Sequence, residues 1–153
     1  MQNADLPAQI QLIASDAGFP LSRVIIEITE SALHHDLKKA QQVAGELKAL
    51  GCKLALDDFG TGYSSLRHLQ SMLFDEIKID QSFIREMTDD RNCRKIVAAI
   101  IGLGQSLGLK TVAEGVETEE QADMLIWLGC DQAQGWRYAV SYTHLTLPTK
   151  RIV

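Results

Sequence analysis

The chain has 153 residues, of which 46% are hydrophobic and 23% charged, and its formal net charge at pH 7 is −5. This size and composition are typical of one globular domain with its own hydrophobic core. The acidic balance argues against a protein that binds DNA or RNA duplexes through a basic face. Three widely spaced cysteines without a C-x-x-C pair indicate neither a disulfide framework nor a zinc ribbon.

Targeting signals are not evident in the sequence. Its apolar runs stay well below the roughly 18 residues of a membrane span, and residues 1–7 lack the basic and apolar regions of a signal peptide. The three cysteines are expected to be buried free thiols in a reducing cytoplasm, which is the location we expect. A membrane anchor in another segment of a longer parent protein is compatible with this expectation.

The first half of the chain alternates helical and strand patterns. Met1 to Gly18 is predicted to be a helix, and Val24 to Ile28 a short strand. Ser31 to Leu50 has apolar residues near helical spacing and stops at Gly51, as helices often do. Lys53 to Asp57 then reads as a buried strand.

The same alternation continues in the second half. The predicted elements are a short helix at 66–72, a strand at 76–80, a helix at 92–107, a strand at 110–113, a helix at 118–128 and a last strand at 132–136. Thr118 followed by Gln121 is a capping-box signature at the start of one helix. This repeat of strands and helices with short connections predicts a parallel α/β sheet. About five units are present, so the sheet is either open or part of an eight-stranded barrel.

Residues 140–153 do not continue this repeat. The run V-S-Y-T-H-L-T-L-P-T-K-R-I-V has no helical rhythm. It could form a final edge strand, but we expect a non-native or disordered tail. The predicted domain therefore covers residues 1–139.

The most informative stretch is K-L-A-L-D-D-F-G-T-G-Y-S-S, at 53–65. A buried strand here runs into two adjacent carboxylates, Asp57 and Asp58, and a glycine-rich loop. Adjacent carboxylates repel each other unless a cation or proton lies between them, so a hard divalent metal is a natural partner. An acidic turn that merely closes a strand is an equally open interpretation.

Polar residues recur at the ends of the predicted strands. The five are Glu27, Asp57, Lys78, Glu114 and Gln134. Because the carboxyl ends of parallel strands share one edge of a sheet, this is how an α/β barrel builds a site. Structural alternatives remain: Glu27 could pair with Lys53 or Lys78, Lys78 could be a solvated edge residue, and Gln134 could satisfy only local backbone.

Five strings in the correct order resemble the EAL-domain family. They are E-I-T-E-S (27–31), D-D-F-G-T-G-Y-S-S-L (57–66), K-I-D-Q-S-F-I (78–84), A-E-G-V-E-T (113–118) and A-Q-G-W (133–136). The resemblance implies a metal-dependent phosphodiesterase that hydrolyses cyclic di-GMP to linear pGpG with two Mg²⁺ or Mn²⁺ ions. It also implies a partial (β/α)8 TIM-type barrel of about five to six β/α units, with the first strands missing.

The resemblance implies roles for residues at matching positions. Metal ligands would be Glu27, Asp57, Asp58 and Glu114, with Asp57 bridging two cations. Glu114 would also be a catalytic general base, and Lys78 a catalytic residue that holds the attacking water or a phosphate oxygen. Gln134 and Asp80 would lie near the metals or the nucleotide. The loop and its support would be Glu30, Gly60, Thr61, Gly62 and Glu117.

The chain departs from the family pattern at its start. The Glu-Ala-Leu motif, an asparagine ligand on the next strand and a substrate-contacting arginine are absent. We therefore expect a C-terminal fragment of an EAL domain that is inactive as an isolated chain, although the parent protein is active. The alternative is a catalytically silent EAL-like receptor for cyclic di-GMP. Sensory or GGDEF-type domains in the parent chain, and a homodimer formed through the barrel, are compatible with the resemblance.

Overall fold

The computed structural model describes residues 6–60, 69, 72–135 and 145–146. Their helices and strands, in chain order, are α1 (Leu6–Asp16), the 3-10 helix η1 (Leu21–Arg23), β1 (Ile25–Thr29), α2 (Glu30–His35), α3 (Leu37–Ala49), β2 (Lys53–Phe59), β3 (Glu76–Ile79), α5 (Gln81–Glu86), α6 (Arg91–Leu107), β4 (Lys110–Ala113), α7 (Glu119–Leu128), β5 (Gln132–Ala133) and β6 (Leu145–Thr146). None of the described helices is both long and apolar enough to cross a bilayer.

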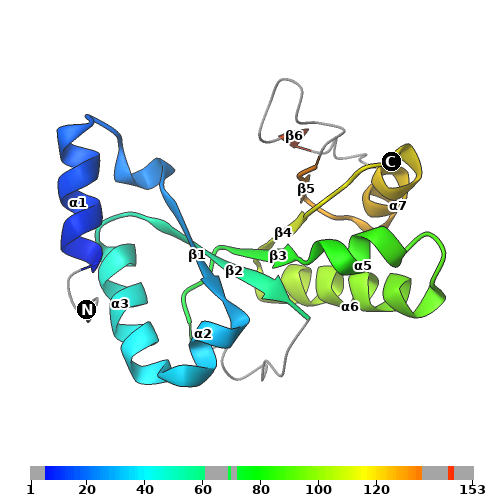
Figure 1. Ribbon diagram of the computed structural model, residues 1–153, viewed down its shortest axis with the longest axis horizontal. Coiled ribbons are helices and arrows are strands. Elements are labelled where there is room, and N and C mark those ends of the chain that lie inside the picture. Colours follow the sequence, from blue (N-terminus) through cyan, green and yellow to red (C-terminus); the bar gives the residue numbers. More distant parts are fainter. Residues whose placement is uncertain (1–5, 61–68, 70–71, 136–144, 147–153) are drawn as a thin grey trace.

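The strands form one six-stranded sheet whose order follows the chain, from β1 to β6 (Figure 1). β1 to β5 are parallel, and each pairs with the next strand in sequence. A doubly wound sheet reverses its strand order at a switch point, whereas a β/α barrel adds each strand on the same side. The predicted partial barrel is therefore confirmed, and in the described part of the chain β1 pairs with β2 alone.

One element lies within the expected tail. The two residues of β6 pair antiparallel with β5, so that Thr146 is opposite Gln132 and Leu145 opposite Ala133. At Leu145 and Thr146 the structure therefore shows the final edge strand that the sequence analysis gave as the alternative to a disordered tail. The other residues of 140–153 lie outside the described part of the chain.

The helix predicted over 31–50 is interrupted. It forms two helices, α2 and α3, which meet at Asp36. Asp36 has an extended φ of −157° and its carboxylate accepts a hydrogen bond from the Lys39 backbone N–H at 3.1 Å, which caps α3. An aspartate at this position competes with helix continuation because its side chain satisfies the free N–H groups of a new helix.

Helix α5 was not predicted from the sequence. It begins directly after β3, where the Asp80 carboxylate accepts a hydrogen bond from the Ser82 backbone N–H at 2.9 Å. With six residues, α5 is too short for helical periodicity to reveal. The helix predicted at 66–72 lies largely outside the described residues.

The central strands are covered on both faces, as their apolar sequences predict. Leu54, Ala55 and Leu56 of β2 are fully buried, and so are Ile77 and Ile79 of β3. Helix α3 packs on β2, and α6 packs on β3 and β4 (Figure 1). The core thus lies between the sheet and these helices, which leaves the carboxyl ends of the strands to carry polar groups.

Asp75 and Asp131 accept hydrogen bonds at the amino-terminal ends of β2 and β4, away from the carboxyl ends of these strands. Asp75 Oδ2 accepts a hydrogen bond from the Leu54 backbone N–H at 2.8 Å, and its carboxylate pairs with Lys48 Nζ at 2.8 Å. Asp131 Oδ2 accepts hydrogen bonds from the Thr111 backbone N–H at 2.8 Å and from the Thr111 hydroxyl at 3.0 Å. These bonds give acceptors to the donor groups of Leu54 and Thr111, two fully buried residues.

We expect Asp131→Ala to destabilise the fold. The substitution leaves the N–H and hydroxyl of the fully buried Thr111 without their acceptor, which costs about 1–3 kcal/mol of unfolding free energy. Urea unfolding followed by circular dichroism measures this loss. Asp123→Ala on the exposed face of α7 is the control, and equal stabilities of the two variants would contradict the assignment.

Candidate active site

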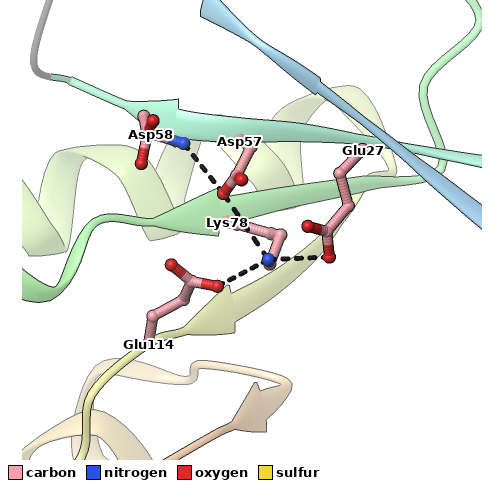
Figure 2. A network of polar contacts seen from close by, with 5 residues as sticks. All are labelled: Glu27, Asp57, Asp58, Lys78 and Glu114. Atoms are coloured by element: carbon pink, nitrogen blue, oxygen red, sulfur yellow. Dashed lines mark hydrogen bonds and ion pairs between the residues drawn. The ribbon is translucent and has the colours of Figure 1, made fainter.

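Charged side chains converge at the carboxyl ends of four neighbouring strands (Figure 2). Glu27 comes from β1, Asp57 from β2 and Lys78 from β3, and Glu114 follows β4 directly. The parallel pairing of these strands carries residues separated by up to 87 positions in sequence to one rim, as the sequence predicts.

Lys78 lies at the centre of this group. Its Nζ is 2.7 Å from Glu27 Oε1, 2.5 Å from Glu114 Oε1 and 3.5 Å from Asp57 Oδ1 (Figure 2). The Lys78 side chain is only 8% exposed, whereas that of Glu27 is 49% exposed. The alternative that Lys78 is a solvated edge residue is therefore wrong, because β3 is an interior strand.

The carboxylates determine the ionisation of Lys78. Burial alone would lower the pKa of Lys78, but hydrogen bonds to Glu114 and Glu27 and the negative charges of Glu114 and Asp57 raise it well above its ordinary value. The ammonium is thus a permanent positive charge at neutral pH.

Asp57, Asp58 and Glu114 form a compact set of oxygen donors. One carboxylate oxygen from each lies within 4.8 Å of the others. Asp58 has a left-handed backbone with φ of 56°, and its N–H donates to Asp57 Oδ1 at 3.0 Å. This turn brings two neighbouring carboxylates to the same rim, although consecutive residues of a regular strand point to opposite faces.

The pKa values reflect this crowding. Burial, followed by the negative charges of Asp57 and Asp80, raises the pKa of the Asp58 carboxyl. Burial also raises the pKa of Glu114, against the opposing effect of Lys78. Three oxygen donors that repel one another fit a hard divalent cation such as Mg²⁺, Mn²⁺ or Ca²⁺.

Glu27 enters the site through Lys78. The structure shows the Glu27–Lys78 ion pair that the sequence left open as one alternative, and Glu27 is not a member of the close set formed by Asp57, Asp58 and Glu114. Its role as a metal ligand stays a prediction.

Asp80 and Gln134 lie next to the rim. Asp80 caps α5 and its charge acts on Asp58. The Gln134 backbone N–H donates to Ala113 O at 2.8 Å, and the Gln134 carbonyl accepts from Val116 N–H at 2.9 Å. The backbone of Gln134 thus satisfies local groups, and the nucleotide contacts predicted for both side chains stay predictions.

Of the five residues expected to form the loop or support it, the structure describes Glu30, Gly60 and Glu117. Glu30 is 3% exposed, and its Oε2 accepts a hydrogen bond from the Gly60 backbone N–H at 3.3 Å. This contact joins the start of α2 to the end of β2, and the anchoring of the loop that follows stays a prediction. Glu117 pairs with Arg85 at 3.5 Å. Thr61 and Gly62 lie outside the described residues.

A second close cluster was not predicted from the sequence. Glu86, Asp90 and Cys93 lie at the connection between α5 and α6, and the Cys93 thiol donates to Glu86 Oε2 at 3.3 Å and to Asp90 Oδ2 at 3.5 Å. Burial, and then these hydrogen bonds and charges, raise the pKa of Cys93 to about 11. The sequence analysis did not predict α5, so it gave no reason to expect Glu86 near Asp90 and Cys93 at the start of α6.

We therefore expect Cys93 to react slowly with alkylating agents. With a pKa of about 11, roughly one thiol in a thousand is ionised at pH 8, so the labelling rate should rise about tenfold per pH unit up to pH 10. Mass spectrometry of iodoacetamide-treated protein resolves Cys93 from the other cysteines. Glu86→Gln should lower the apparent pKa, and a rate plateau near pH 8.5 in the unsubstituted protein would refute the assignment.

Comparison with known proteins identifies relatives of the whole described fold. The model of the EAL domain matches residues 1–140. Among curated proteins, the cyclic di-GMP phosphodiesterase RocR of Pseudomonas aeruginosa is 40% identical over 135 residues, which cover 88% of this chain and 34% of RocR. The chain spans between 17% and 34% of the length of the curated relatives compared.

Solved structures agree with this match. The PaMucR phosphodiesterase in complex with c-di-GMP superposes with a TM-score of 0.86 and 37% identity, covering 98% of this chain and 59% of that structure. BlrP1 of Klebsiella pneumoniae, in a complex with manganese and cyclic di-GMP, superposes with a TM-score of 0.81 and 34% identity, covering 87% of this chain and 34% of BlrP1.

Proposed function

Because the chain belongs to the EAL domain family, we propose that it forms the C-terminal part of a metal-dependent phosphodiesterase domain that hydrolyses cyclic di-GMP to pGpG. The observation that carries the proposal is the set of Asp57, Asp58 and Glu114 beside the buried Lys78. Relatives named as cyclic di-GMP phosphodiesterases support the substrate.

Asp57, Asp58 and Glu114 would hold the divalent cations, and Glu27 would add a further oxygen. Mg²⁺ and Mn²⁺ both suit such ligands, and manganese is present in one similar structure. When bound, two such cations offset the charge of the phosphodiester and make water a stronger nucleophile at neutral pH.

The chain's own residues then act on the substrate and the attacking water. Glu114 accepts one proton of the water as the water oxygen adds to phosphorus, one P–O ester bond breaks, and the leaving oxygen takes up a proton from solvent. Lys78 places a fixed positive charge where the phosphate oxygens gain negative charge. Asp80 and Gln134 contact the nucleotide, and Glu30 holds the loop that begins at Gly60.

Hydrolysis by the complete protein tests this proposal. Purified protein should convert cyclic di-GMP to pGpG with Mg²⁺ or Mn²⁺, as followed by chromatography, and EDTA should stop the reaction. Tight binding of cyclic di-GMP without turnover would instead support the silent receptor, and neither binding nor turnover would contradict both functions.

The isolated 153-residue chain should show little or no turnover in the same assay. It lacks the Glu-Ala-Leu motif and the expected asparagine ligand, so its cations would have fewer protein ligands. Robust Mg²⁺-dependent turnover by the isolated chain would contradict this part of the proposal.

The remaining assignments belong to the same proposal. Residues 1–139 are the part of the EAL domain, and 140–153 are the tail, consistent with a family match that ends at residue 140. We place the domain in the cytoplasm, with sensory or GGDEF-type domains in a longer parent chain and a homodimer through the barrel. MucR, a relative 46% identical over 115 residues, is named as a bifunctional diguanylate cyclase and phosphodiesterase.

A further inference from the structure

We propose that Lys78 is a built-in competitor for the divalent cations, because its ammonium is paired with carboxylates that the cations require. Lys78 therefore sets the cation concentration at which the site fills. This inference rests on the proposed function, since it assumes that Asp57, Asp58 and Glu114 hold metal ions.

The Lys78 ion pairs and the close set of oxygen donors share two carboxylates, those of Asp57 and Glu114. Glu114 and Asp57 belong to the close set with Asp58, and both also lie within ion-pair distance of Lys78 Nζ, at 2.5 and 3.5 Å. Glu27, the further expected ligand, is held by the same ammonium at 2.7 Å. Figure 2 shows the ammonium between Glu27, Asp57 and Glu114, with Asp58 beyond Asp57.

Lys78 cannot leave this position freely. Its side chain is 8% exposed and comes from β3, which lies between β2 and β4. A cation that binds Glu114 must either break the ion pair with Lys78 or accept a positive charge beside it. Breaking the ion pair costs its favourable energy, and a cation bound beside the ammonium is repelled by it in a partly buried site. Both outcomes weaken cation binding.

The same contacts have a second consequence for the protein. Four carboxylates meet at this rim, and their mutual repulsion destabilises the fold unless positive charge offsets it. Lys78 supplies that charge before any cation binds. The lysine thus stabilises the empty rim at the expense of cation affinity.

Lys78→Met in the complete protein tests the inference. Titration with MnCl₂ alone in a calorimeter, without nucleotide, gives the affinity independently of turnover. Removal of one positive charge from ion-pair distance should tighten Mn²⁺ binding about tenfold or more. Lys78→Arg keeps the charge and should bind Mn²⁺ far more weakly than Lys78→Met.

A matched control is available at the other end of the sheet. Lys48 pairs with Asp75 at 2.8 Å near the amino-terminal end of β2, so Lys48→Met removes the same charge and an ion pair but should leave Mn²⁺ affinity unchanged. Thermal unfolding gives a second measurement. Lys78→Met should unfold at a lower temperature without metal and gain more from added Mn²⁺ than the unsubstituted protein.

The outcomes separate the inference from the proposed function. If the unsubstituted protein binds Mn²⁺ and Lys78→Met binds it equally or more weakly, the competition is refuted and the metal site stands. If neither protein binds Mn²⁺, the proposed metal site is refuted together with the inference. Tighter binding by both Lys78→Met and Lys48→Met would also refute it, since a general charge effect would then suffice.

Discussion

Asp57→Asn should reduce cyclic di-GMP hydrolysis by the complete protein on the order of 100-fold or more. Asp57 belongs to the close set of oxygen donors and also lies 3.5 Å from Lys78 Nζ. The amide has nearly the same shape but no negative charge, so it weakens cation binding without leaving a cavity. Steady-state rates at several Mn²⁺ concentrations measure the effect, and high Mn²⁺ should restore part of the activity.

The control for this substitution is Asp75→Asn. Asp75 makes the same type of contacts with Lys48 and a backbone N–H, but at the amino-terminal ends of the strands. Asp75→Asn should lower stability while turnover by the folded fraction stays close to that of the unsubstituted protein. Equal losses of turnover in the two variants would show that charge removal acts through the fold and not through a metal site.

Gly135→Ala should disrupt the carboxyl end of β5. A Cβ at this position would lie 2.1 Å from the Val116 carbonyl oxygen and 2.4 Å from its backbone nitrogen, so the backbone must move. The movement would break the hydrogen bonds by which Gln134 joins Ala113 and Val116. We expect a loss of about 3 kcal/mol or more in unfolding free energy, measured by urea unfolding.

Gly102→Ala provides a control with the opposite sign. Gly102 lies within α6, and among the described residues no heavy atom comes within 4 Å of a Cβ built there. Alanine should therefore stabilise the helix by up to about 1 kcal/mol. If Gly135→Ala were as stable as Gly102→Ala, the close approach of β5 to Val116 would be wrong.

The succession of helices and strands could be predicted because the residues that begin and end several helices are characteristic. Gly51, Gly108 and Gly129 have positive φ where helices end, and Thr118 with Gln121 forms the expected capping box. The break at Asp36 was missed because the apolar spacing continues across it. At β3 the predicted strand is present, but the sequence does not reveal that its charged residues Glu76 and Lys78 are buried together with Ile77 and Ile79.

The charged residues of the rim could be predicted from the sequence, but of their mutual contacts only the Glu27–Lys78 ion pair was among the stated alternatives. The sequence places Glu27, Asp57, Lys78 and Glu114 at strand ends, and parallel pairing then brings them together. It does not reveal that Lys78 takes the central position, because that depends on side-chain reach across three strands. The left-handed backbone of Asp58 was equally hidden, since only the folded turn shows that both aspartates face the rim.

The most direct test is a crystal structure of the complete protein grown with Mn²⁺ and measured at wavelengths where manganese scatters anomalously. We predict anomalous peaks about 2.0–2.6 Å from carboxylate oxygens of Asp57, Asp58 and Glu114. Manganese bound elsewhere, with these three side chains turned away from one another, would contradict the account.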